Sequence, residues 1–277
     1  IAAGEVLIIT QRFEGQDLQQ LQKGTATAKQ VTLSFYVKGN ANATYTCELF
    51  DRDNNRTIGQ AFAVTTAWNR IELTFPGDTS DPFDDDNARS LDIQIFLHGG
   101  TTFSGGTFVN NTWADQANNT RMAESHTSIL DSTDRTFFIT GVQMELGDTA
   151  TPFEHRSYGE ELALCQRYYE RITSVGAGAN FMAFASGFNT STTITQSTLA
   201  YVKKRTAPTI AFAAAAQFRI THTNTATACS AISASQIGDA RGIVDATVGS
   251  AALTAGQGSA VTANNNTTAY IEVISEL

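Results

Sequence analysis

The chain has 277 residues, of which 42% are hydrophobic, and carries a formal net charge of −9. This length accommodates two domains that each bury a core, and the hydrophobic fraction is typical of a globular protein. The negative charge argues against partners such as nucleic acid or an anionic membrane surface, because both are bound through a basic face.

Three further features of the sequence narrow the class of protein. Three cysteines are too few, and odd in number, for a disulfide framework. No apolar run approaches the length that spans a bilayer, so no membrane insertion is expected. Basic residues cluster only at 203–205, and three such charges beside a proline predict a solvated strand end rather than a phosphate site.

Residues 1–150 predict one strand after another. In the clearest strand, 31–37, every second residue is apolar, which is the period of a half-buried strand. The Asp- and Asn-rich turn at 51–57 predicts a hairpin. In the last strand, Phe138, Val142, Met144 and Leu146 are expected on one side. Other strands are expected at 1–15, 45–50, 60–64, 71–75, 91–97 and 137–146. So many short strands with no helix between them predict an antiparallel sandwich, most economically a jelly roll.

The stretch 151–172 is the part of the chain that predicts a helix. Ser157 is a suitable N-cap, and Glu160 completes a reciprocal capping box, so the helix is expected to begin near Tyr158. Apolar residues follow at helical spacing and form one stripe: Leu162, Cys165, Tyr169 and Ile172. We therefore expect a helix that joins two β units rigidly, with this stripe buried.

Residues 174–277 form a second β-rich region. Strands are expected at 181–188, 192–202, 209–220, 242–248 and 269–277. Large apolar residues are scarce here, so we expect a core too thin for an isolated domain, completed by sister copies of the chain. The alanine-rich run 211–216 is either a flat surface for another copy or an inner strand over a shallow core.

Several blocks along the chain resemble a known family. They read QRFEGQDL…GTATAKQVTLSFYVKG, AWNRIELTFPGDTS, FFITGVQMELGDTATPFEHRSYGEELALCQRYYERI, YVKKRTAPTI and YIEVISEL. Together they resemble the C-terminal region of tail-fibre and related appendage proteins of marine bacteriophages. The resemblance implies a carbohydrate-binding-module-like jelly roll at 1–150, a connector with a helix at 151–173, and a β-rich trimerisation or tip domain at 174–277.

The same resemblance carries expectations about function. It implies a homotrimer on the virion, in a tail fibre or other external appendage, assembled in the host cytoplasm. It implies adhesion to host polysaccharide or lipopolysaccharide, with no enzymatic activity. Other tail or virion proteins are expected to attach through residues upstream of the first residue of this chain.

Aromatic side chains are the candidates for contact with sugar, because an aromatic face suits the C–H-rich face of a pyranose. Trp113 lies in the long excursion at 101–130, and Trp68 precedes a strand. Tyr36 and Phe96 point away from the aliphatic faces of their strands. For Trp68, the clear inward residues of the strand that follows favour core packing over sugar contact. Cover by a helix or a neighbouring subunit is the alternative for Tyr36 and Phe96.

An acidic loop is the candidate metal site. Its carboxylates are oxygen ligands of the kind that calcium accepts: Asp81, Asp84, Asp85 and Asp86. The spacing matches no defined calcium loop, which favours a solvated acidic loop over a calcium site. Calcium is the one cofactor that the sequence suggests.

Catalytic residues are not assigned. Glycan-cleaving spikes need paired carboxylates across a groove, usually on a repetitive solenoid, and the sequence has no internal repeat. It also lacks a GxSxG motif, and its histidines are scattered. Two competing functions stay open: a purely structural fibre knob or collar, and a tailspike hydrolase.

Overall fold

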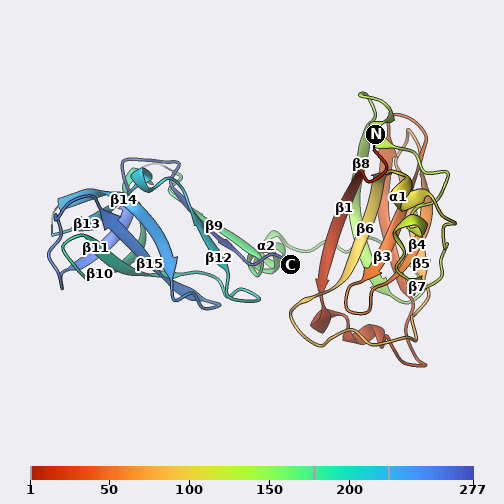
Figure 1. The fold of residues 1–277 in the computed structure, drawn as a ribbon, viewed down its shortest axis with the longest axis horizontal. Coiled ribbons are helices and arrows are strands. Elements are labelled where there is room, and N and C mark those ends of the chain that lie inside the picture. The colour runs from red at the N-terminus through yellow and green to blue at the C-terminus, as the bar shows by residue number, and fades with distance from the viewer. Residues whose placement is uncertain (1, 177–178, 224) are drawn as a thin grey trace. The chain divides into compact units, whose positions relative to one another are not determined.

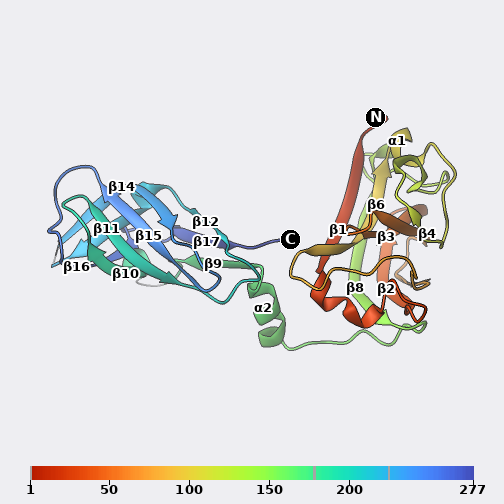
Figure 2. The same ribbon diagram turned by 60° about the horizontal axis from the view of Figure 1, so that its bottom comes forward.

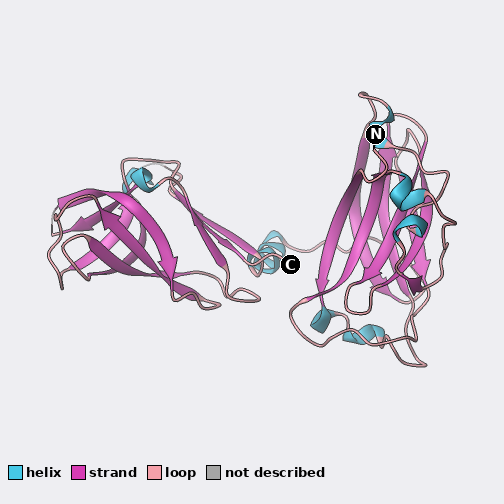
Figure 3. Ribbon diagram, viewed as in Figure 1, coloured by secondary structure: helices cyan, strands magenta, loops and turns pink. Residues whose placement is uncertain are grey.

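The structure is a computed structural model that describes residues 2–176, 179–223 and 225–277. It divides into two compact units, of which the first ends at His155 and the second is Arg156–Glu276. Both units consist of antiparallel sheets, so the predicted all-β class is confirmed (Figures 1 and 3). The boundary lies within the expected connector 151–173, whose helix belongs to the second unit.

The first unit is a sandwich of two antiparallel sheets. The larger sheet has the strand order β1 (Val6–Glu14), β6 (Arg89–Gly99), β3 (Ala43–Asp51), β4 (Arg56–Val64) and β7 (Ala114–Asp115). The smaller sheet has the order β5 (Asn69–Phe75), β2 (Val31–Gly39) and β8 (Phe137–Leu146). The chain passes from one sheet to the other between β1 and β2, between β2 and β3, and again before β5, β6 and β8, as in jelly rolls. The predicted hairpin is the β3–β4 pair.

The core of the sandwich lies between the two sheets. Leu33, Phe35 and Val37 on β2 are fully buried, as their alternation predicts. They pack in one cluster with Tyr45 and Cys47 on β3. Before β2, the chain forms the short turns η1 (Gly15–Asp17) and η2 (Gln19–Leu21).

A long excursion between β6 and β8 covers the outer face of the larger sheet. It contains α1 (Thr101–Ser104), η3 (Asn118–Thr120) and η4 (Ile129–Asp131). Beneath it β6 is buried along nearly its whole length, on both faces. A Cβ atom at Gly99 would clash with the sulfur of Met122, so a larger residue there would require the Met122 side chain to move.

The helix α2 (Tyr158–Gln166) begins as predicted. The Ser157 hydroxyl accepts from the Glu160 N–H at 3.3 Å, and the Glu160 carboxylate accepts from the Ser157 N–H at 3.0 Å. The helix ends at Gln166 rather than near residue 172, because Tyr169–Thr173 form strand β9. This stretch, YERIT, is rich in aromatic and β-branched residues, which favour an extended backbone once a partner strand is present.

The prediction that the apolar stripe of the helix is buried is wrong for the single chain. No described residue of α2 is buried, and Leu162 and Leu164 are 41% and 50% exposed. Cys165 is also exposed. Tyr169, expected on the same stripe, lies on β9 and bonds to Glu272 through its hydroxyl at 2.7 Å.

The second unit is built around a closed six-stranded barrel. Its strands follow one another in the order β10 (Ala183–Asn189), β11 (Ile194–Ala200), β15 (Arg241–Val248), β14 (Thr225–Ser235), β13 (Phe218–His222) and β16 (Gly258–Ala263). A three-stranded sheet, β12 (Thr209–Phe212), β17 (Tyr270–Ile274) and β9, lies beside it (Figure 2). Two short turns, η5 (Ala179–Phe181) and η6 (Ala215–Gln217), complete the unit.

The expectation that sister copies complete the second core is wrong. Phe218, Ile220, Val244 and Val261 are 0% exposed within the single chain, in one cluster with Ile271 of the three-stranded sheet. A barrel of few strands has a narrow interior, so a small number of large side chains fills it.

The other differences between the predicted and observed second unit concern which residues form strands. The expected strand 209–220 is interrupted by η6, so the run 211–216 ends β12 and forms a turn rather than a flat strand. Strands β14 and β16 were not predicted, because their Ala-, Ser- and Thr-rich sequences lack the large apolar residues that reveal a strand.

Candidate functional site

Exposed aromatic side chains gather at one end of the outer face of the smaller sheet. Paired residues on neighbouring antiparallel strands point to the same side, so Lys38 on β2 lies beside its partner Phe138 on β8. The Lys38 Nζ lies 5.2 Å from the centre of the Trp68 ring and 5.3 Å from that of Phe138. The two aromatic residues are 47% and 48% exposed. We call Trp68, Lys38 and Phe138 the aromatic row.

The turn that carries Trp68 is fixed by local hydrogen bonds. The Thr65 hydroxyl donates to the carbonyl of Ala67 at 3.0 Å, and the side-chain amide of Asn69 donates to the carbonyl of Ala63 at 3.4 Å. These bonds close the loop between β4 and β5 and set where the indole leaves the backbone. Trp68 is therefore an exposed side chain on an ordered turn, and the core-packing alternative is wrong.

Tyr36 occupies the next position along this face and is 38% exposed. The Arg70 guanidinium lies 6.0 Å from the centre of its ring, and Arg70 also pairs with Glu72 at 3.2 Å. Across the sheet, Gly141 has a φ of +60°, and a Cβ atom there would lie 3.2 Å from the Tyr36 ring. A glycine in this left-handed conformation gives the ring its place against β8.

The other end of the face is covered by the segment that follows β8. The Thr151 N–H donates to the Glu145 carboxylate at 3.1 Å, and the Glu154 N–H donates to the Gln143 side-chain oxygen at 2.7 Å. The hydrogen bond from the Thr151 hydroxyl lowers the pKa of Glu145. The segment leaves the aromatic row and Tyr36 open to solvent.

The sequence missed part of this site. Phe138, expected on the same side of its strand as Met144, lies on the outer face, whereas Met144 packs against the core. The β2–β8 register shifts between Ser34 and Tyr36, opposite the left-handed Gly141. A β-bulge of this kind reverses the alternation of a strand, which the sequence pattern does not reveal. The outward position of Lys38 followed from its alternation with Val37, but no pattern predicted that it would lie between two rings.

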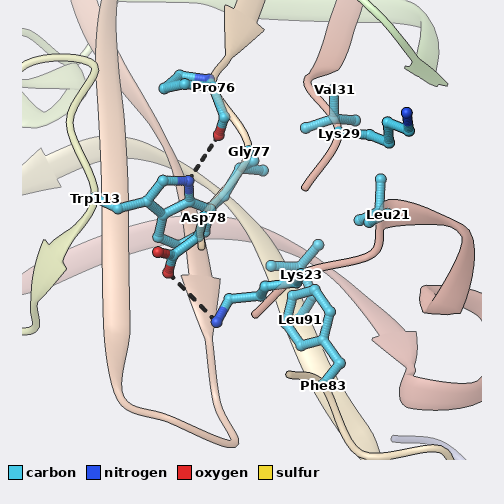
Figure 4. A pocket seen from close by; sticks show the side chains of 11 residues that line it. Leu21, Lys23, Lys29, Val31, Pro76, Gly77, Asp78, Phe83, Leu91 and Trp113 are labelled. Atoms are coloured by element: carbon cyan, nitrogen blue, oxygen red, sulfur yellow. Dashed lines mark hydrogen bonds and ion pairs between the residues drawn. The ribbon is translucent and has the colours of Figure 1, made fainter. Parts of the chain in front are cut away.

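Phe96 and Trp113 lie elsewhere. Phe96 is 0% exposed beneath the excursion, 6.4 Å between ring centres from Phe103, so the prediction that it lines a binding face is wrong. Trp113 is half-buried, and its indole N–H donates to the carbonyl of Pro76 at 2.8 Å (Figure 4). The cavity beside Trp113 measures about 20 Å³, which is room for about one water molecule and not for a sugar ring.

The acidic loop is organised by an ammonium group. Lys23 Nζ donates to the carbonyls of Ser80 at 2.7 Å and Asp81 at 2.6 Å. It also pairs with Asp51 at 2.7 Å and Asp78 at 3.3 Å, and its side chain is 3% exposed (Figure 4 shows the Asp78 contact). No sequence pattern distinguished this lysine from a solvated one.

The four candidate calcium ligands are exposed and do not share a centre. Asp81 contributes its carbonyl to Lys23, Asp84 accepts from the Gln19 amide through its carbonyl at 3.1 Å, and the Asp86 carboxylate accepts from the Ala88 N–H at 2.8 Å. Asp85 is exposed on the same loop. Across residues 2–176, 179–223 and 225–277, no three His, Cys, Asp or Glu side chains gather where they would hold a metal ion.

Buried charges lie under the excursion. Arg121, 8% exposed, donates through Nε to the two carboxylate oxygens of Glu48 at 2.9 and 3.1 Å and through Nη2 to Gln94 at 2.6 Å. Burial raises the pKa of Glu48, which is 1% exposed. Asp92, also buried, accepts from Arg52 Nε at 2.6 Å. The carboxylates face guanidinium groups that also stack on aromatic rings, which is an arrangement that anchors the excursion to the sheet.

His98 adds a titratable group to this buried layer. It is 4% exposed, and its Nδ1 lies 2.8 Å from the Ser128 hydroxyl, while its Nε2 has no hydrogen-bond partner among the described residues. Burial, and to a smaller extent His126, lower the pKa of His98, and Glu5 opposes this shift.

We therefore expect the first unit to lose stability as the pH falls from about 7.5 to about 5.5. The unfolded chain takes up a proton at His98 below the ordinary pKa, whereas the folded chain resists it, so acid favours unfolding. Denaturant unfolding followed by tryptophan emission measures this, since both tryptophans lie in the first unit. The His98→Gln variant is the control. If the wild type showed no steeper pH dependence than this variant, the prediction would be wrong.

Comparisons with known proteins assign no family. No family model and no curated protein matches the chain. Among solved structures, a point mutant of oxalate decarboxylase from Bacillus subtilis aligns over 99% of this chain and 70% of that one, with 9% identity and a TM-score of 0.14. Similarity this low supports no argument about fold or function. Within the described residues, the helices are too short or too polar to cross a membrane.

Proposed function

We propose that the chain is a virion tail-fibre protein that binds glycans of the host surface through the aromatic row and Tyr36. The observation that carries the proposal is the half-exposed pair of rings, Trp68 and Phe138, held on a rigid sheet. Aromatic rings on ordered backbone stack on sugar rings with little loss of conformational entropy. The resemblance of the sequence blocks to phage tail fibres supports the same function.

The proposal includes a homotrimer and a role in binding rather than in hydrolysis. Single sugar contacts are weak and wet, so three linked copies would gain strength through avidity. The exposed apolar residues Leu162 and Leu164 of α2 support self-association, since apolar side chains on one helix are often covered by a partner. The same helix favours a second candidate function, a structural fibre knob without glycan contact.

Binding to a panel of purified bacterial capsular and lipopolysaccharide glycans tests the proposal. We expect wild-type protein to bind at least one glycan, and the Trp68→Ala variant to bind it about tenfold more weakly or worse, as when an aromatic anchor is removed. Phe188→Ala is the matched control, because Phe188 is 53% exposed on β10 of the second unit. We expect this control to bind like the wild type.

Two results would count against glycan binding at this face. One is wild-type binding that survives Trp68→Ala unchanged, which would place the contact elsewhere. The other is the absence of wild-type binding across the panel, which would favour the structural fibre knob. Release of oligosaccharides from any bound glycan would contradict the non-enzymatic role.

A further inference from the structure

The aromatic row contains a positive charge without a carboxylate partner. Three other lysines lie close to carboxylates: Lys23 to Asp51 at 2.7 Å, Lys203 to Asp239 at 3.4 Å and Lys204 to Glu170 at 3.0 Å. Lys38 instead contacts the two rings, and among the described residues no carboxylate pairs with it. Lys29 also has no carboxylate partner among the described residues, but Lys38 is the lysine that lies beside two half-exposed aromatic rings.

The Lys38 ammonium also makes the aromatic row a positively charged donor of hydrogen bonds. It carries three N–H donors and no acceptor, and the rings on either side supply π faces and, in Trp68, one further N–H donor. The nearest other cation on this face, Arg70, is occupied by Glu72 at 3.2 Å and by the Ser34 hydroxyl at 3.3 Å. The chemical complement of the row is therefore an apolar ring face that carries a negatively charged acceptor.

From this arrangement we infer that the glycan bound at the aromatic row is acidic, with hexuronic acid as the sugar that occupies it. A hexuronate has C–H-rich ring faces that stack on Trp68 or Phe138 and a carboxylate attached directly to the ring. The ring contacts of Lys38 Nζ, at 5.2 and 5.3 Å from the centroids, place the ammonium within reach of that carboxylate. In a sulfate or phosphate ester, an ester oxygen separates the charged group from the sugar ring, and that group is bulkier than the carboxylate of a hexuronate.

This inference rests on the proposed glycan-binding function and specifies its ligand. Partly desolvated charge-assisted hydrogen bonds are stronger than neutral ones, and the attraction is screened by salt. The binding of uronate oligomers is therefore expected to weaken as ionic strength rises, whereas stacking of a neutral sugar on the same rings is not.

The two tryptophans provide a direct readout. In a ¹⁵N-labelled sample the indole N–H of Trp68 reports the aromatic row, and that of Trp113, bonded to Pro76, is an internal control. The probes are oligomers of galacturonate, mannuronate and glucuronate, each paired with its carboxyl-reduced counterpart, and a sulfated galactan without uronate. We expect at least one uronate oligomer to shift the Trp68 signal alone and to bind about tenfold more tightly than its reduced form.

Three variants identify the charge. Lys38→Gln is expected to bind the uronate about tenfold more weakly and to lose the preference over the reduced oligomer, while Lys38→Arg retains the preference. Lys29→Gln, which removes an exposed lysine from the same unit, is expected to bind like the wild type. An unchanged melting temperature confirms that each variant is folded.

The outcomes separate this inference from the proposed function. Equal binding of uronate and reduced oligomers, unaffected by Lys38→Gln, would overturn the acidic ligand and leave glycan binding at Trp68 intact. A Trp68 shift with the sulfated galactan alone would also overturn it. If no oligomer shifts Trp68, the inference fails, and the polysaccharide panel with Trp68→Ala decides the proposed function independently.

Discussion

Replacing Arg121 by leucine is expected to lower the free energy of unfolding of the first unit by about 3–5 kcal/mol, the cost of breaking a buried ion pair by removing one partner. The guanidinium is 8% exposed, and it satisfies both oxygens of Glu48, which is 1% exposed. It also lies 5.0 Å from the centre of the Phe50 ring and 5.1 Å from that of Phe96. Without it, a buried carboxylate is left with no cation directly bonded to it, and the excursion loses one of its links to β3.

The loss is expected to depend on pH. Burial already raises the pKa of Glu48 in the wild type, and removal of Arg121 removes the group that opposes this shift. The folded variant then retains a proton that the unfolded chain releases, so its stability falls as the pH rises above the ordinary pKa of a glutamate. Denaturant unfolding followed by tryptophan emission is therefore expected to show a smaller loss at pH 5 than at pH 8.

A double variant is the control for the Arg121 prediction. Replacing both Glu48 and Arg121 by leucine removes the two charges together, and apolar replacement of a whole buried pair is often neutral or stabilising. We expect it to regain most of the lost stability. A single Arg121→Leu change that cost less than about 1 kcal/mol would show that the pair is solvated.

Lys204→Leu is expected to destabilise the second unit by about 2–4 kcal/mol, slightly less than a fully buried pair because its partner is partly exposed. Lys204 is 0% exposed, and its Nζ donates to the carbonyl of Gln166, the last residue of α2, at 2.6 Å. It also pairs with Glu170, 17% exposed, at 3.0 Å. A cation at this position satisfies an unpaired carbonyl and the negative end of the helix.

Calorimetry and hydrogen exchange measure the effect. The transition assigned to the second unit is expected to move to lower temperature, while the tryptophan-detected transition of the first unit stays unchanged. Amides in the last turn of α2 are expected to exchange faster. Lys203→Leu is the matched control, since this neighbouring side chain is 74% exposed and pairs with Asp239 at 3.4 Å, a contact worth less than about 1 kcal/mol. An equal loss of stability in Lys204→Leu and Lys203→Leu would contradict the prediction that the buried lysine contributes more than the exposed one.

Lys204 also corrects the prediction of a solvated strand end at 203–205. Three consecutive basic residues gave no sign that the middle one is buried, because its partners, Gln166 and Glu170, lie more than thirty residues earlier in the chain. Arg205 is likewise engaged, with its Nε donating to the carbonyl of Ser275 at 2.8 Å. Only Lys203 lies where the pattern placed it, on the surface.

The candidate site, like Lys204, could be predicted from the sequence only where contacts with distant segments do not decide burial. Tyr36 was identified because an aromatic residue that breaks the apolar alternation of its strand tends toward the surface, whereas the sequence favoured core packing for Trp68. Phe96 met the same criterion as Tyr36, and the prediction was wrong because the excursion covers β6 on the side that the alternation left open. The bulge at Gly141 puts Phe138 and Met144 on opposite faces of β8, although the alternation predicted one side for both. The aromatic row brings together side chains from three separate segments of the chain: β2, β8 and the turn before β5.

Features whose causes lie within a few residues could be predicted from the order of the amino acids alone. These are the alternating core of β2, the hairpin between β3 and β4, and the cap of α2 at Ser157 and Glu160. Tertiary structure decided the rest: that 169–173 pairs with β17 as a strand, that the barrel closes around its own core, and that Lys38 lies between two rings. The physical reason is that periodicity and capping act through neighbouring backbone groups, whereas burial and pairing depend on partners that only the folded chain brings close.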